Sequence, residues 1–290
     1  MEVASTNWRI LYRGALDSCN YSCSYCPFAL KKNTREELAY DKAGLFRFVD
    51  WVEQRVEHTH ILFTPWGEGL IRSYYQQAML KLSHAPNVKK VAIQTNLSCA
   101  LDWVKDVNKK VFALWVTYHP LEVDFEKFVA KCEFLIEEGI QFSIGVVGVK
   151  EHFSAITKLK ERIKNRYIWI NAYKREKDYY SDAEERWLSS VDALFPINNK
   201  VYATEGKACD AGDISFTVDE KGDVQSCHFI KKQLGNIYTD DIVDMLHPRT
   251  CVNTECRCYL GYINLKELNL NTVYGNSLLE RIPQDIIKKP

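Results

Sequence analysis

The segment at residues 18–27 reads SCNYSCSYCP and places three cysteines, Cys19, Cys23 and Cys26, within eight residues. It follows an apolar stretch, residues 8–12, that we expect to form a β-strand. Thiolates crowded on one loop can bind one soft metal centre, and iron-sulfur clusters favour such close spacing. A four-iron cluster bound by three cysteines keeps one iron open, as a catalytic metal requires. A zinc site built on Cys23 and Cys26 with two remote ligands is the alternative, and it would leave Cys19 unused.

The composition is that of an ordinary globular protein, with 290 residues, 38 Lys and Arg against 38 Asp and Glu, and 46% hydrophobic residues. This length fits one large domain, alone or with a small appendage. A formal charge of zero makes nucleic acid and membrane surfaces unexpected partners. Neither a signal peptide nor a run of roughly 20 apolar residues is present. We therefore expect a cytoplasmic protein, in which cysteines stay reduced and serve mostly as metal ligands.

Short apolar runs alternate with longer amphipathic stretches up to about residue 175. The expected strands are residues 8–12, 60–63, 88–94, 111–117, 141–147 and 168–171. The expected helices are residues 41–55, 74–82, 102–108, 125–138 and 155–164, with Cys132 on the buried face of the fourth. Connections of this length join parallel strands, and right-handed crossovers curl such a sheet toward a barrel. Functional loops then lie at the carboxyl ends of the strands.

This pattern predicts an α/β fold, a partial (β/α)6 barrel similar to a TIM barrel, over residues 1–195. A short helix is expected at residues 183–194, ended by Phe195 and Pro196. Residues 214–218 and 224–225 then flank a turn with Gly222 and predict a β-hairpin. A helical tail is expected at about residues 277–287. We expect residues 196–290, with the hairpin and the helix, to form a small second domain.

The spacing Cys-x3-Cys-x-Tyr-Cys after the first strand resembles the signature of the radical S-adenosylmethionine (SAM) superfamily, and the resemblance covers roughly residues 8–175. It implies that Cys19, Cys23 and Cys26 hold a [4Fe-4S] cluster at the catalytic centre and that Tyr25 packs near the adenine of SAM. In that family the methionine part of SAM chelates the open iron. An electron from the cluster cleaves SAM to methionine and a 5'-deoxyadenosyl radical, which abstracts a hydrogen atom from the substrate.

The same resemblance places cofactor-binding positions at the ends of the later strands. The second strand runs into TPWGEG at residues 64–69, where Gly67 and Glu68 match the family's turn for the SAM ammonium and Trp66 replaces a glycine. Candidates on strands three to six are Thr95, Asn96, Thr117, His119, Ser143 and Asn171. A loop-capping or core role for His119 is equally open. Candidates for a base or a hydrogen donor are Lys174, His119, Asp210 and Tyr118.

Five more cysteines lie in the last third of the chain, and they are Cys209, Cys227, Cys251, Cys256 and Cys258. The hairpin between the first two, followed by LGNI at residues 234–237, resembles the SPASM/Twitch domains that carry an auxiliary cluster after many radical SAM barrels. Five thiols exceed by one the need of a second [4Fe-4S] cluster. We expect Cys209, Cys227 and Cys251 as ligands, together with either Cys256 or Cys258. A structural zinc site with four thiolates is the alternative.

Together these features predict a radical SAM oxidoreductase that modifies a peptide or protein oxidatively, as in ribosomal peptide maturation. Dehydrogenation or rearrangement of a small molecule such as a sugar, cyclitol or nucleoside is one alternative. A non-catalytic iron-sulfur or zinc scaffold is another. The implied cofactors are SAM and two [4Fe-4S] clusters. The implied partners are a reductant protein of the flavodoxin or ferredoxin type and the peptide or small-molecule substrate.

Overall fold

The chain folds into alternating strands and helices, and a computed structural model describes residues 7–28, 31–275 and 279–287. The strands are β1 (Asn7–Arg13), β2 (His58–Phe63), β3 (Val88–Thr95), β4 (Phe112–Tyr118), β5 (Gln141–Val147), β6 (Ile168–Asn171), β7 (Tyr202–Ala203), β8 (Ala208–Cys209), β9 (Ser215–Asp219), β10 (Asp223–Gln225), β11 (Gln233–Asn236), β12 (Arg249–Thr250) and β13 (Glu255–Cys256). The helices are α1 (Arg35–Glu53), α2 (Ser73–His84), α3 (Phe125–Glu137), α4 (Phe153–Arg162), α5 (Asp182–Val191), α6 (Phe195–Asn198), α7 (Ile242–Met245), α8 (Tyr259–Tyr262), α9 (Asn271–Tyr274) and α10 (Gln284–Ile287). Within the described ranges, 3₁₀ turns lie at Asp102–Asp106, Lys150–His152 and Lys266–Leu268.

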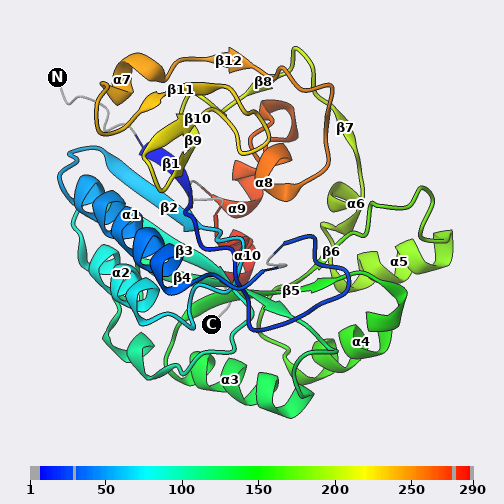
Figure 1. Ribbon diagram of the computed structural model, residues 1–290. Coiled ribbons are helices and arrows are strands. Elements are labelled where there is room, and N and C mark those ends of the chain that lie inside the picture. The colour runs from blue at the N-terminus through cyan, green and yellow to red at the C-terminus, as the bar shows by residue number, and fades with distance from the viewer. Residues whose placement is uncertain (1–6, 29–30, 276–278, 288–290) are drawn as a thin grey trace.

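One sheet of nine strands organises the molecule, in the order β11-β10-β9-β1-β2-β3-β4-β5-β6. Strands β1 to β6 pair in parallel and in chain order. In Figure 1 helices α1 to α4 follow the outer side of this sheet, and the loop between β1 and α1 crosses the middle of the view. The predicted α/β fold with a parallel, barrel-like sheet is therefore confirmed.

Local sequence signals explain where the main helices begin and end. Thr34 caps α1 in a capping box with Glu37, so the helix begins at Arg35, six residues before the predicted start. Asp124 accepts a hydrogen bond from the backbone of α3, and Gly139 follows that helix with a φ of 68°. A glycine adopts this left-handed conformation without steric cost. These caps leave the predicted apolar face of α3 intact, with Cys132 fully buried.

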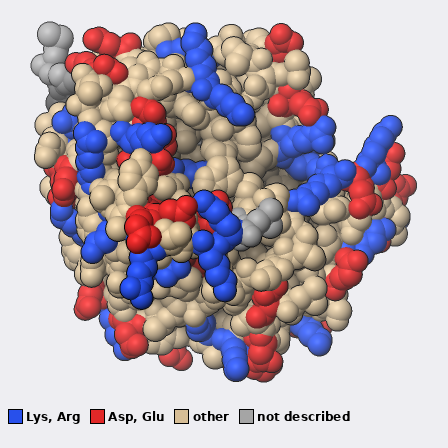
Figure 2. Space-filling model, viewed as in Figure 1, with Lys and Arg blue, Asp and Glu red and all other residues tan. Residues whose placement is uncertain are grey.

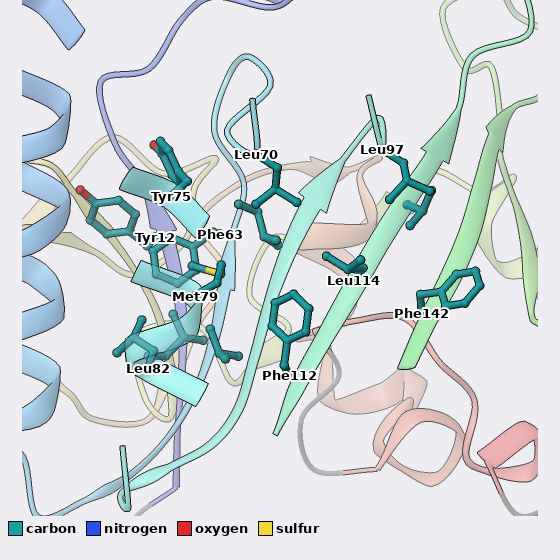
Figure 3. Close-up of a cluster of buried hydrophobic side chains, with 14 of the residues drawn as sticks. Tyr12, Phe63, Leu70, Tyr75, Met79, Leu82, Leu97, Phe112, Leu114 and Phe142 are labelled. Atoms are coloured by element: carbon teal, nitrogen blue, oxygen red, sulfur yellow. The ribbon is translucent and has the colours of Figure 1, made fainter. Parts of the chain in front are cut away.

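The sheet separates two layers of core. On the outer side, Met79 and Leu82 of α2 pack with Phe63 and Phe112 of the sheet (Figure 3). On the inner side, Trp115 and Trp169 pack with aromatic side chains of the chain's last part, among them Tyr259, Tyr262 and Tyr274. Burial of apolar area on both faces stabilises parallel sheets. No helix in the described ranges is long and apolar enough to cross a membrane.

The predicted hairpin forms, and it extends the barrel sheet. Strand β9 pairs in parallel with β1, with Arg9 opposite Ser215, and β10 pairs antiparallel with β9. Gly222 takes a φ of 88° in the turn, while Asp219 accepts hydrogen bonds from two backbone N–H groups of the same turn. The sheet thus continues across the expected boundary at residue 195, and the division into two domains stays a prediction.

Three predicted elements differ in detail. Phe195 and Pro196 begin α6 and do not end the preceding helix, since proline at a first helical position loses no hydrogen bond. The stretch expected as a helix at residues 102–108 is a 3₁₀ turn. Within the expected tail at residues 277–287, residues 277–278 lie outside the described ranges, and helix α10 begins only after Pro283 because a proline disfavours helical backbone in the residue before it.

Candidate active site and second thiol cluster

A cavity of about 570 Å³ opens at the carboxyl ends of the parallel strands. Twelve of the predicted site residues line it: Cys19, Cys23, Tyr25, Cys26, Gly67, Glu68, Thr95, Asn96, Thr117, His119, Asn171 and Lys174. They come from the loop after β1, the loop after β2 and the ends of β3, β4 and β6. Positions more than 150 residues apart in the chain thus share one site, as the barrel topology predicts.

The three cysteines of the first loop are free thiols held by local hydrogen bonds. The N–H of Cys26 donates to the carbonyl of Cys23 at 3.0 Å and forms a turn. Both cysteines line the cavity. The sulfur of Cys19 accepts from the N–H of Tyr21 at 3.4 Å. Burial raises the pKa of Cys19, and it raises the pKa of Cys23 to about 11. A metal centre that binds here must therefore displace thiol protons.

His119 lies between two members of the cysteine motif. Its Nδ1 is 3.3 Å from the sulfur of Cys23 and 2.7 Å from the hydroxyl of Tyr25, and the two rings are parallel with their centres 6.0 Å apart. Burial lowers the pKa of His119 to about 4, so the ring is neutral at pH 7. A neutral imidazole can hold the tyrosine hydroxyl in one orientation while that ring lines the cavity.

The Gly67-Glu68 turn is locked against the cysteine loop. A Cβ on Gly67 would lie 1.8 Å from the carbonyl oxygen of Ser18, so only glycine fits this approach. Glu68 accepts hydrogen bonds from the hydroxyl of Thr95 at 2.8 Å and from the N–H of Asn96 at 2.6 Å. Burial raises the pKa of Glu68 to about 7. A carboxylate oriented in this way can accept hydrogen bonds from an ammonium group in the cavity.

Three of the predicted residues lie away from the cavity. Ser143 is fully buried beneath Trp169, whose indole N–H donates to the serine hydroxyl at 3.2 Å. Asp210 forms an ion pair with Arg9. Tyr118 packs into the outer core. Ser143 is covered because the Trp169 ring lies directly over β5, where a Cβ on Gly145 would be 2.0 Å from that ring. That ring fills the barrel over Ser143 and forms part of the cavity floor.

Lys174 lines the cavity, but its ammonium group is used by the backbone. It donates to the carbonyls of Asn198 and Arg257, and to that of Lys200 at 3.2 Å. Burial lowers the pKa of Lys174 to about 8. The lysine therefore ties the end of β6 to the segment that carries the last cysteines, and its role as a base stays a prediction.

A second cavity, of about 670 Å³, lies among the later cysteines. Cys209, Cys227, Cys251 and Cys256 line it, whereas Cys258 is exposed and is absent from the described lining. Short ladders hold two of these thiols, because β8 pairs with β12 and β13 pairs with β7. Burial raises the pKa of Cys227 and of Cys256 to about 12. The structure thus groups four of the five thiols and sets Cys258 apart.

The described thiols are not arranged to hold a single metal ion. Within the described residues, no three His, Cys, Asp or Glu side chains are placed so that they could hold one metal ion. An iron-sulfur cluster sets a different requirement, because each thiolate binds a different iron atom of a larger object. Three free thiols around one cavity and four around another match the ligand sets of such clusters.

Comparisons with known proteins support the fold. No protein-family model and no curated protein matches the chain. The structure is similar to Streptococcus suis SuiB bound to precursor peptide SuiA, with 13% identity, a TM-score of 0.57, and coverage of 83% of this chain and 65% of that one. It is also similar to anSMEcpe with bound AdoMet and Kp18Cys peptide, with 18% identity, a TM-score of 0.53, and coverage of 84% and 81%. This chain has the fold of the radical SAM enzymes.

The radical SAM fold also brings residues to the cavity that the sequence analysis did not select. Arg13, Trp66 and Trp169 are examples, and His228 lies 5.3 Å from the Trp66 ring. Arg13 carried a usable signal, because it is a charged residue at the carboxyl end of β1, directly after the apolar run at residues 10–12. The contact with His228 carried none, since it depends on how β9 and β10 join the sheet. The chain spans less than two thirds of the SuiB structure.

Proposed function

We propose that this protein is a radical SAM enzyme that binds SAM in the first cavity and cleaves it reductively. The observation that carries the proposal is the convergence of three free thiols, the Gly67-Glu68 turn and Asn96 on one cavity at the carboxyl ends of the strands. The radical SAM fold supports it independently of the motif. The cavity volume of about 570 Å³ is in the range of sites for ligands of this size.

In this proposal Cys19, Cys23 and Cys26 hold a [4Fe-4S] cluster and leave one position open for SAM. When bound, the cluster supplies the electron that splits SAM into methionine and the hydrogen-abstracting 5'-deoxyadenosyl radical. Glu68 accepts hydrogen bonds from the ammonium of SAM, and the hydrogen bonds from Thr95 and Asn96 hold its carboxylate in place. Tyr25 borders the same cavity and is oriented by the neutral His119. Asn96, Thr117 and Asn171 supply polar contacts to the nucleoside.

We further propose that the reaction is an oxidative modification of a peptide or protein. Both similar structures named above were determined with a bound peptide. A substrate that has lost a hydrogen atom must still lose one electron and release one proton to give a two-electron oxidised product. A second [4Fe-4S] cluster on Cys209, Cys227, Cys251 and Cys256 is the proposed acceptor of that electron. A reductant protein of the flavodoxin or ferredoxin type would supply the electron that starts the reaction.

The test of the chemistry is the formation of 5'-deoxyadenosine. Protein purified and reconstituted without oxygen is analysed for iron, sulfide and zinc, and is then incubated with dithionite and SAM. We expect about eight irons per chain and 5'-deoxyadenosine detectable by mass spectrometry. Iron-loaded protein that forms no 5'-deoxyadenosine would contradict the proposal and would favour a scaffold that carries electrons or docks a partner.

The test of the substrate class is separate. The neighbouring genes are searched for a short precursor peptide, and the peptide found there is incubated with the reconstituted protein, SAM and reductant. A two-electron oxidation of the peptide is expected to lower its mass by the mass of two hydrogen atoms. Unchanged peptide together with an oxidised small alcohol would favour the small-molecule alternative.

A further inference from the structure

Arg13, the last residue of β1, is a nearly buried cation in the wall of the first cavity. Its Nε and Nη2 donate to the hydroxyl of Thr64 at 3.1 and 3.0 Å. Its Nη1 lies 2.7 Å from Nε2 of His228, and its guanidinium carbon lies 4.1 Å from the centre of the Trp66 ring. The side chain is therefore held in one orientation by groups from the loop after β2 and from the segment after Cys227.

The positive charge of Arg13 has no carboxylate partner in the part of the chain that the structure describes. His228 must accept the hydrogen bond, because a guanidinium has only donors. The imidazole is therefore neutral, because the Nε2 that accepts this hydrogen bond carries no proton. Glu68 is the one acidic side chain among the described residues that line the cavity, and its oxygens are bound by the end of β3. Burial lowers the pKa of Arg13 to about 10, and the charge of a Cys258 thiolate acts in the opposite direction and raises it.

Arg13 also has unused hydrogen-bond donors. A guanidinium carries five N–H groups, and the contacts with Thr64 and His228 account for three of them. Lys174 differs, since its ammonium donates to three carbonyls. Side chains of both charges are spread over the face of the molecule that Figure 2 shows. Two parallel N–H groups of a guanidinium match the two oxygens of a carboxylate or phosphate.

We propose that Arg13 binds an oxyanion of the substrate, a carboxylate or a phosphate, and so fixes the orientation of that substrate in the cavity. The proposal rests on the proposed function and narrows it to an anionic substrate. For a peptide, the anion is an acidic side chain or a terminal carboxylate. The position fits this role, because Trp66 precedes the Gly67-Glu68 turn and His228 follows Cys227. An anion on Arg13 therefore lies between the proposed SAM site and the second thiol cluster.

The experiment uses inorganic phosphate as the probe and the reconstituted, air-free protein without reductant. Phosphate binding is measured by calorimetry with and without saturating SAM, in wild type, Arg13→Gln and Arg13→Lys. Arg162→Gln is the matched control, since Arg162 pairs with Glu133 on the surface. We expect saturable binding in wild type and in the control, with or without SAM. In Arg13→Gln the affinity should fall by roughly 10-fold or more, because charge-assisted hydrogen bonds are lost. Arg13→Lys keeps the charge without the fork and should fall between these values.

A second measurement needs no variant and so does not depend on how a variant folds. Phenylglyoxal modifies accessible arginines, and peptide mapping of wild-type protein gives the rate at Arg13. Phosphate should slow this rate, while the rate at Arg162 should stay the same.

Several results would overturn the proposal. They are no saturable phosphate binding by wild type, an equal affinity in Arg13→Gln, or no protection of Arg13 from phenylglyoxal. Loss of phosphate binding when SAM is saturating would assign Arg13 to the carboxylate of the cofactor instead. The proposed function fails in a different way, since phosphate binding that depends on Arg13 in a protein that forms no 5'-deoxyadenosine would leave the anion site standing.

Discussion

The two thiol-lined cavities differ in the residues that surround their cysteines. The first has three thiols together with the carboxylate of Glu68 and polar side chains from the ends of long parallel strands. The second has four thiols, and its described lining includes neither Asp nor Glu. A metal centre with an incomplete protein ligand set and polar neighbours can bind an organic molecule, whereas a complete set closes the centre. The contrast supports the proposal that cofactor chemistry takes place in the first cavity and that the second has a supporting role.

The supports of the two cavities differ as well. Strands of four to eight residues, each paired with its neighbours in the sheet, hold the first cavity. The second depends on ladders of two residues and on the loops around them. Such short ladders contribute little stability alone. We therefore expect the second cavity to depend on its metal for order, and the first to keep its shape without one.

The largest expected effect comes from Cys23→Ala in the first cavity. Loss of one of three thiolates should remove the cluster, so 5'-deoxyadenosine formation should drop to the background rate, and about four of about eight irons should be lost. Ser24→Ala is the matched control, because Ser24 is an exposed neighbour on the same loop. Anaerobic iron analysis and mass spectrometry provide the readouts. Full iron content in Cys23→Ala would contradict the assignment of the loop.

The second cavity is tested by comparing Cys256→Ser with Cys258→Ser. Cys256 lines the cavity and Cys258 is exposed outside it. Cys256→Ser should lose about four irons, while Cys258→Ser should keep the wild-type content. Mössbauer or electron paramagnetic resonance spectra of the reduced variants would show which cluster is missing. The reverse pattern would place the fourth ligand at Cys258 and overturn the grouping of the thiols.

Glu68→Gln tests the organic half of the first site. The glutamine amide is neutral and cannot form a charge-assisted hydrogen bond with an ammonium group. The affinity for SAM should therefore fall by roughly 10-fold or more. Because burial raises the pKa of Glu68 to about 7, wild-type affinity should increase between about pH 6 and pH 8 as the carboxylate ionises. The variant should lack this increase. Equilibrium dialysis measures both, with Glu126→Gln on the first turn of α3 as the control.

The same residue should leave a mark on stability when SAM is absent. The pKa of Glu68 in the fold, about 7, exceeds its ordinary value of 4.5. Its contribution to folding is then fully present below about pH 4.5 and is lost as the pH rises to about 7. Relative to Glu68→Gln, the wild-type free energy of unfolding should fall by up to about 3 kcal/mol over this window. Urea titrations at several pH values measure this free energy. An equal pH dependence in wild type and Glu68→Gln would contradict the prediction.

The smallest effect is expected for Ser143→Ala, which marks the floor of the first cavity. The substitution removes the acceptor of the Trp169 indole N–H and the donor to the carbonyl of Glu280 at 2.8 Å. Stability should fall by about 1–3 kcal/mol, as for a buried polar group left unpaired. SAM affinity should stay unchanged, whereas Thr95→Ala, which frees Glu68, should weaken it. A strong loss of SAM binding in Ser143→Ala would restore the serine as a cofactor ligand.

Much of the fold followed from short-range patterns. The predicted bounds of β5 and β6 match the structure, because each strand is a continuous apolar run between polar breaks. Helix α3 was equally legible from its apolar face and from Gly139. The helix predicted at residues 102–108 is instead a 3₁₀ turn that ends at Asp106, because Val107 already has an extended backbone.

The candidate site likewise contains residues that the sequence predicted and residues whose roles depend on packing. Sequence spacing predicted the three thiols of the first loop, and the resemblance to the radical SAM superfamily predicted the Gly67-Glu68 turn; both line one cavity. The sequence did not separate Cys258 from Cys256, because two positions one residue apart differ only in what packs around them. It also placed Ser143 by its position on a strand, and a strand position does not tell how far a tryptophan from the neighbouring strand reaches across.

By itself, the sequence determined the alternating strands and helices, the parallel sheet and the motif of three cysteines, because periodicity, caps and spacing act within a few turns of chain. Only the tertiary structure decided that β9 joins the edge at β1, that four later thiols share one cavity, and that His228 meets Arg13. Each of those contacts joins positions far apart in the chain. They depend on which surfaces the whole molecule buries together, and no local pattern records that choice.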